Sequence, residues 1–195
     1  IIMKAIISVT DKTGISKFAT FLKEQSYELL STSGTAQLLK ENKIPVTLVE
    51  DYTKQEEILN GRVKTLHPKL YGGILNDRKN KEHQKECERY NIDSIDIVVV
   101  NLYPFEENKC IKNIDIGGVS LVRAAAKNYE NVLVIVNPDD YDYVTINYKL
   151  FMSKSCSILR KHFAAKAFHM IAQYDIHIAK YFNPLMENYH LTKHY

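Results

Sequence analysis

Hydroxyl-bearing residues and a glycine occur together at two points of the sequence, each between a strand-like and a helix-like pattern. The strings are SVTDKTG (residues 8–14) and STSGTA (residues 31–36). At a helix N-terminus, free backbone N–H groups and the helix dipole favour an anion, and glycine allows it to come close. Lys12 adds a positive charge. Helix capping explains either string more simply, but two of them on neighbouring strands favour phosphate binding.

A third string, GRVKTLHP (residues 61–68), carries two basic side chains separated by one residue. In an extended loop Arg62 and Lys64 project to the same side. A lysine can act as a point charge or a proton donor, whereas an arginine clamps an anion with its planar fork. A solvated basic loop is the simpler interpretation of this string alone. His67 is either an acid–base group or a structural hydrogen-bonding residue before Pro68.

A fourth group combines NLYPF (residues 101–105) with NIDIGGVS (residues 113–120). Asn101 and Tyr103 follow the most apolar run of the chain, where a polar side chain requires a partner. Asp115 precedes two glycines at an expected helix start, where it can cap the helix or face a ligand. Further along that helix, Arg123 and Lys127 share a face. The alternative for Lys127 is a solvated charge that complements the dipole at the helix end.

The elements that position these residues follow from apolar periodicity. Strands are predicted at 4–9, 27–30, 46–49, 71–75, 97–102 and 132–136. Helices are predicted at 15–25, 35–42, 81–90 and 119–129, with a short one capped by Thr53 and Glu56 and a long one or a pair over 155–183. Strands that alternate with helices favour βαβ units and a mostly parallel sheet. Such sheets bind ligands beyond the carboxyl ends of their strands, where the four strings lie.

Composition limits the classes of protein to consider. The chain has 195 residues, which suffice for one core. Its net charge of +3 is too small to indicate a nucleic-acid partner, and its apolar runs are too short to span a membrane. The three cysteines, Cys87, Cys110 and Cys156, are scattered and suggest neither disulfides nor a metal site. A reducing cytoplasm is therefore the expected location.

Seven strings occur in one order along the chain: SVTDKTG, STSGTA, GRVKTLHP, NLYPFEE, IDIGG, RAAAKN and NPDDY. Together they resemble the N-terminal IMP cyclohydrolase domain of the bifunctional purine biosynthesis (PurH) family, over residues 4–182. The resemblance implies a three-layer α/β fold of the methylglyoxal synthase type, with a mostly parallel, twisted sheet flanked by helices. It also implies a single domain over 1–195, with a core at about 3–150 and a C-terminal helical segment at about 155–183. On this resemblance we expect the family's formyltransferase domain to be absent, and an excised domain and a standalone protein remain equally open.

The resemblance further implies the reaction. The carboxamide nitrogen of 5-formamidoimidazole-4-carboxamide ribotide (FAICAR) attacks the formyl carbon of the same molecule, and loss of water gives inosine monophosphate (IMP). No cofactor or metal is expected, because both reacting groups belong to one substrate. The family also implies a homodimer.

The family's catalytic positions correspond to Lys64, Tyr103, Asp115 and Lys127. We expect Asp115 to accept a proton from the carboxamide, Lys64 and Tyr103 to bind the formyl oxygen, and Lys127 to hold the substrate or Asp115. Substrate-binding positions implied by the resemblance are Ser8, Lys12, Ser31, Thr32, Ser33, Gly34 and Thr35 for the phosphate, and Arg62, Thr65, Asn101, Ile116, Gly117 and Gly118 for the base and ribose.

The chain departs from the family in one segment and leaves two other interpretations open. Only residues 106–113 separate the tyrosine motif from IDIGG, where the family has a longer excursion, so the approach to Asp115 is in question. A methylglyoxal synthase would share the phosphate cradle formed by residues 8–14 and 31–36, although the strings RVKTLHP and RAAAKN fit that enzyme family poorly. A regulatory nucleotide-binding module, like the allosteric domain of carbamoyl phosphate synthetase, would keep the cradle but have no use for Lys64, Tyr103 and Lys127.

Overall fold

The core of the chain is a parallel sheet in a computed structural model that describes residues 3–153 and 157–183. Cys156 and the segment 184–195 lie outside the described residues. In the described part the sheet has the strand order β3-β2-β1-β4-β5 and every pair is parallel. The strands are β1 (Lys4–Val9), β2 (Glu28–Ser31), β3 (Thr47–Leu48), β4 (Ile97–Asn101) and β5 (Leu133–Ile135). The predicted parallel α/β sheet is confirmed.

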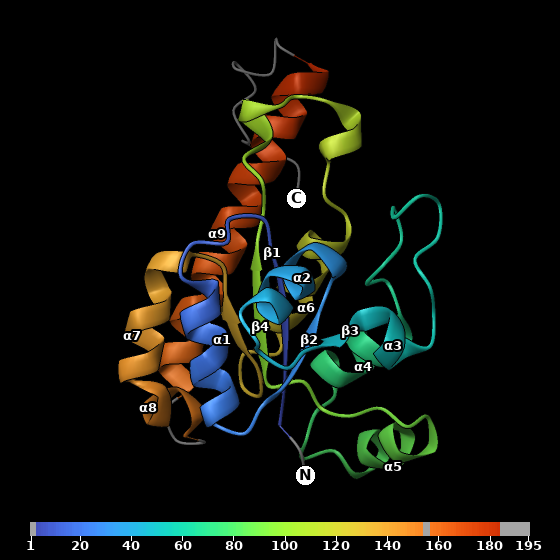
Figure 1. The fold of residues 1–195 in the computed structure, drawn as a ribbon, viewed down its shortest axis with the longest axis vertical. Helices are drawn as coiled ribbons and strands as arrows, with labels where there is room; N and C mark the ends of the chain where they lie inside the picture. The colour runs from blue at the N-terminus through green and yellow to red at the C-terminus, as the bar shows by residue number, and fades with distance from the viewer. Residues whose placement is uncertain (1–2, 154–156, 184–195) are drawn as a thin grey trace, which may run out of the picture.

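Helices cover both faces of this sheet and make three layers (Figure 1). One face packs on α1 (Ile15–Glu24), α2 (Ser33–Glu41), α7 (Tyr141–Ile146) and α8 (Tyr148–Met152). The other packs on α3 (Val49–Thr53), α4 (Pro68–Leu75), α6 (Gly117–Lys127) and the long α9 (Ser157–Phe182). The polar α5 (Lys81–Arg89) lies apart from the sheet, beyond α4 (Figure 1). Short 3₁₀ turns are η1 (Phe105–Glu107), η2 (Ile111–Asn113) and η3 (Pro138–Asp140).

Alternation along β1 explains why the sheet needs two helical layers. Ile7 packs into the cluster under α1, and its neighbour Ile6 packs into the cluster under α6. All five residues of β4 are buried, as its apolar sequence predicts. Burying each large aliphatic side chain stabilises the fold by about 1.5–3 kcal/mol. Because apolar side chains pack on both faces of the sheet, the strand ends that form its carboxyl edge are held in fixed positions.

Two predicted elements are wrong. Residues 71–75 were expected to form a strand but belong to α4, because Pro68 occupies its first turn and the His67 Nδ1 atom caps it, accepting from the Lys69 N–H at 3.1 Å. The helix expected after Thr53 does not form. Instead α3 ends there, because the Thr53 hydroxyl donates to the Val49 carbonyl and Lys54 takes a left-handed conformation. An antiparallel bridge between Ile58 and Val63 closes the following loop.

The predicted long C-terminal helix is confirmed as one element, α9, over the residues that the structure describes. Figure 1 shows α9 running along the sheet and continuing past its carboxyl edge. There α9 packs on η1, and its Tyr174 hydroxyl donates to the Asn113 carbonyl of η2. In the described part of the chain, no helix is both long and apolar enough to cross a membrane.

Candidate functional site

The two hydroxyl strings meet at the carboxyl ends of β1 and β2. The Ser8 and Thr32 hydroxyl oxygens are 2.9 Å apart. Thr35 is tied to the end of β1, because its hydroxyl accepts from the Val9 N–H and donates to the Val9 carbonyl, both at 3.1 Å. The buried Ser31 donates to the Ile7 carbonyl at 2.7 Å. The two strings, residues 8–14 and 31–36, thus form one candidate anion-binding site, which we call the cradle. Ser31 and Thr35 stabilise its buried side.

The first turn of α2 is the open part of this cradle. Ser33 and Gly34 are exposed, and a Cβ atom placed on Gly34 would meet no atom within 4 Å. Thr32 precedes the helix with an extended backbone, so that the first N–H groups of α2 have no carbonyl partner four residues earlier in the helix. This turn can accept an oxyanion.

Asn101, at the end of β4, shapes the loop that follows β1. Its side-chain oxygen accepts from the N–H groups of Thr10 and Asp11, at 2.7 and 2.9 Å, and its amide donates to the Asp11 carbonyl at 2.8 Å. This is the partner that a buried polar residue requires. Lys12, on the same loop, is exposed and donates to the Val9 carbonyl at 3.2 Å.

Lys64 lies beside the cradle. It lines a small cavity together with Thr32, Ser33, Glu50, Glu57 and neighbouring residues of α3 and the loop after it. Its ammonium forms an ion pair with Glu57 at 2.8 Å. Gly61 permits this arrangement, because it has a φ of +80° and a Cβ there would lie 2.8 Å from the Lys64 Cε atom. Arg62 is exposed on this loop, which projects beyond α3 and α4 in Figure 1.

Asp115 and its two glycines form the start of α6. The Asp115 carboxylate accepts from the Gly118 N–H at 2.6 Å and so caps the helix. A Cβ at Gly118 would lie 2.8 Å from that carboxylate, and one at Gly117 would lie 2.5 Å from the buried Thr65 hydroxyl. The glycines therefore let the Lys64 loop and Asp115 pack on the same helical turn. Ile116 is 56% exposed beside them.

Tyr174 of α9 is a site residue that the sequence analysis missed. Its hydroxyl accepts from the Asp115 N–H at 2.8 Å and donates to the Asn113 carbonyl at 3.3 Å. The available signal was spacing: Ala167, Ile171 and Tyr174 repeat at helical intervals, which places Tyr174 on the buried face.

Tyr103 follows β4 and remains 40% exposed. A hydrogen bond from its hydroxyl to the Glu107 carboxylate raises the pKa of Tyr103. Tyr103 is therefore protonated at neutral pH and able to donate a hydrogen bond.

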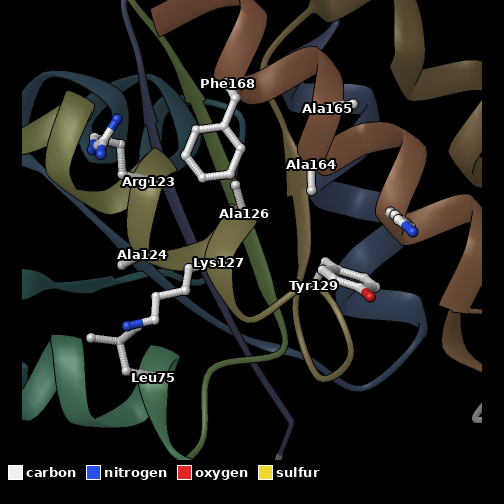
Figure 2. Close-up of a pocket in the computed structure, with 10 residues that line it drawn as sticks. Leu75, Arg123, Ala124, Ala126, Lys127, Tyr129, Ala164, Ala165 and Phe168 are labelled. Carbon is white, nitrogen blue, oxygen red and sulfur yellow. The ribbon is translucent and has the colours of Figure 1, made fainter. Parts of the chain in front are cut away.

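Lys127 does not lie with the other predicted catalytic residues of the same chain. It ends α6, ten residues after Gly117, which corresponds to about 15 Å along the helix axis. Figure 2 shows it extending toward Leu75 in a groove between α6 and α9, whose wall includes Ala164 and Phe168. The groove has a volume of about 610 Å³ and also contains Arg123 and Lys161. Lys64, Tyr103 and Asp115 share the carboxyl edge, whereas Lys127 lies toward the opposite one.

Family models match most of the chain. The MGS-like domain matches residues 14–129, and the AICARFT/IMPCHase bienzyme matches residues 125–194. The chain belongs to the MGS-like domain family. The chain is 49% identical over 187 residues to the bifunctional purine biosynthesis protein PurH of Thermoanaerobacter sp. (strain X514). The aligned region covers 91% of this chain and 37% of that protein. The PurH protein of Persephonella marina is 48% identical, with 92% and 36% covered.

A solved structure has the same MGS-like architecture. The crystal structure of ForH superposes with a TM-score of 0.84 at 32% identity, covering 93% of this chain and 99% of that one. The chain spans about 37% of the length of the curated relatives it matches. Among residues 3–153 and 157–183, no group of histidine, cysteine, aspartate and glutamate side chains is arranged to hold a metal ion.

Proposed function

We propose that the chain is an IMP cyclohydrolase acting in purine biosynthesis. The observation that carries the proposal is the meeting of Lys64 with the hydroxyl cradle in one cavity at the carboxyl edge. The identity of 49% to a PurH protein supports the same conclusion. In this proposal the open turn of α2, with Ser8, Lys12 and Thr32 around it, binds the 5′-phosphate. The buried Ser31, Thr35 and Asn101 hold the cradle in shape.

The proposed chemistry follows from the types of side chain at that edge. The carboxamide nitrogen forms a bond to the formyl carbon, and Asp115 takes the proton that the nitrogen loses. The formyl oxygen then carries the developing negative charge, which Lys64 and Tyr103 stabilise by donating hydrogen bonds. Two protons reach that oxygen, one by way of Asp115 and one from the former formamide nitrogen. The oxygen leaves as water while that nitrogen forms the new carbon–nitrogen double bond, and IMP remains. Arg62, Thr65, Ile116, Gly117 and Gly118 would surround the base and ribose.

Lys127 requires a second copy of the chain in this proposal. A lysine side chain reaches about 6 Å, which is short of the 15 Å along α6 that separates it from the first turn. We therefore propose a homodimer in which the groove between α6 and α9 of one copy faces the cradle of the other. Lys127 would then act in the partner's site.

The organisation and location of the chain are also proposals. We propose that residues 1–195 form one domain and that the chain acts in the cytoplasm. The one sheet shared by both apolar clusters supports the first statement. The free thiols of Cys87 and Cys110 support the second.

Ring closure tests the proposal directly. Purified chain is mixed with FAICAR, and the absorbance of IMP is followed over time. We expect turnover that falls at least a hundredfold in Asp115→Asn and in Lys64→Met, while both variants keep the wild-type melting temperature. Turnover at wild-type rates in both folded variants would refute the site. Retained IMP binding without any ring closure by the wild-type chain would instead favour a regulatory nucleotide-binding module.

A further inference from the structure

Asp115 is held from two sides by different helices. Its carboxylate is fixed to the first turn of α6 through the Gly118 N–H, at 2.6 Å. Its backbone N–H is fixed to the Tyr174 hydroxyl of α9, at 2.8 Å. One bond orients the side chain and the other fixes the main chain from which it projects. Together they leave the carboxylate little freedom.

The bond to Tyr174 is made in a protected environment. Tyr174 is only 7% exposed, and both hydrogen bonds of its hydroxyl are partly buried. The same oxygen donates to the Asn113 carbonyl at 3.3 Å, at the end of η2. Removing the hydroxyl would leave one N–H and one carbonyl without this partner in a partly buried place, which is unfavourable. The segment between them would have to shift to find other partners.

The same stretch of α9 also supports the segment that carries Tyr103. Phe105, which is 1% exposed, packs edge-on against Tyr174 with ring centroids 6.4 Å apart. Tyr181 contacts the same ring at 5.5 Å. His177, between them on α9, lies 3.7 Å from the Glu106 carboxylate. The residues that follow Tyr103 and those that precede Asp115 thus rest on one helix.

We propose that Tyr174 is a positioning residue, which holds Asp115 in place for ring closure through the Asp115 N–H. This inference rests on the proposed function. It also explains how so short a segment between Tyr103 and Asp115 supports a catalytic geometry: α9 supplies the anchor. Because a displacement of about 1 Å can cost a hundredfold in rate, a single positioning bond is enough to affect turnover.

The test compares two tyrosines of the same helix. Tyr174→Phe removes the bridging hydroxyl, and Tyr181→Phe removes a hydroxyl from a residue that contacts Phe105 through its ring. We expect kcat to fall about tenfold in Tyr174→Phe with KM changed less than twofold, and both values to stay within twofold in Tyr181→Phe. Equal kcat values in the two variants would overturn the proposal.

A second measurement separates this inference from the proposed function. Amide hydrogen exchange at Asp115, followed by NMR without substrate, should accelerate at least tenfold in Tyr174→Phe and stay unchanged in Tyr181→Phe. Unchanged exchange in Tyr174→Phe overturns the anchor, even if the wild-type chain closes no ring. If Tyr174→Phe does not fold, Phe105→Leu weakens the ring contact that helps to hold Tyr174 in place, and it should give a smaller acceleration. No acceleration in that variant would also overturn the proposal.

Discussion

At the scale of the residue, the site depends on where a side chain is absent as much as on where one is present. Gly34 borders open space, whereas Gly117 faces the Thr65 hydroxyl at a distance that no Cβ tolerates. The sequence predicted both glycines as part of the site. It could not distinguish them, because the difference lies in what packs opposite each one.

Alanine at these two glycines should therefore give opposite results. Gly34→Ala places a methyl group where the phosphate would approach, so the Kd for IMP should rise at least tenfold while the melting temperature stays the same or increases slightly. Gly117→Ala overpacks against Thr65 and should reduce the free energy of unfolding by roughly 1–3 kcal/mol. Calorimetric titration and thermal unfolding measure the two effects. Unchanged IMP affinity in Gly34→Ala would remove α2 from the phosphate site.

Glu57 illustrates a residue effect that the sequence analysis did not anticipate. It pairs with Lys64 at 2.8 Å and lines the same small cavity as Ser33, so its negative charge lies close to the turn of α2 proposed to bind the phosphate. Glu57→Gln should tighten IMP binding about threefold at low ionic strength, and the gain should shrink as salt is added. Glu82→Gln is the matched control, since Glu82 pairs with Lys85 on the exposed face of α5. A gain of equal size in both variants would assign the effect to net charge alone.

The pKa of Tyr103 leads to a pH prediction at the same scale. The bond to Glu107 raises the pKa of Tyr103, so its hydroxyl keeps its proton to a higher pH. In Glu107→Gln the pKa should return toward its ordinary value of about 10. The loss of activity at alkaline pH should then begin at a lower pH than in the wild-type chain. The profile of kcat against pH measures this, and coincident profiles would exclude Tyr103 as the donor.

At the scale of the element, the parallel strands and most helices could be predicted because their apolar periodicity was unambiguous. The segment 71–75 could not, since its short apolar run fits a strand and a helix equally well. Its helix forms because Pro68 and His67 begin it. Glycine in this helix also allows the chain around Asp93 to pack closely against it, because a Cβ at Gly73 would lie 2.5 Å from the Asp93 carbonyl oxygen. Neither cause is visible in periodicity.

The cap of α4 can be tested by substitution. His67→Ala removes the acceptor for the Lys69 N–H and should lower the free energy of unfolding by about 1 kcal/mol. His67→Asn keeps an acceptor at the same position and should recover most of that loss. Chemical denaturation measures both values. A loss of turnover in His67→Asn at normal stability would point instead to an acid–base role for His67.

At the scale of the whole molecule, the position of Lys127 shows what a list of motifs omits. Lys127 follows Asp115 by twelve positions, most of them in α6, so the two residues belong to opposite ends of one helix. The helix predicted at 119–129 already implies this separation between Asp115 and Lys127. The arrangement of two copies could not, because it depends on surface shape rather than on periodicity.

Mixing inactive variants tests the proposed dimer. Asp115→Asn and Lys127→Ala should each be nearly inactive alone, and equal amounts mixed and allowed to exchange subunits should regain about a quarter of wild-type activity if exchange is random. In a mixed dimer one of the two sites carries both native residues. No recovery after demonstrated exchange would rule out action of Lys127 in the partner's site.

The central place of β1 has a further consequence for how the chain is made. β1 is synthesised well before its partner β4, and the Lys4 N–H donates to Asp96, which lies 92 positions later in the chain. Until that region emerges, β1 can pair only with β2, and one of its edges stays open to other chains. Such long-range pairing slows folding and prolongs exposure to aggregation. Production of the chain should therefore depend on chaperones more strongly than its size suggests.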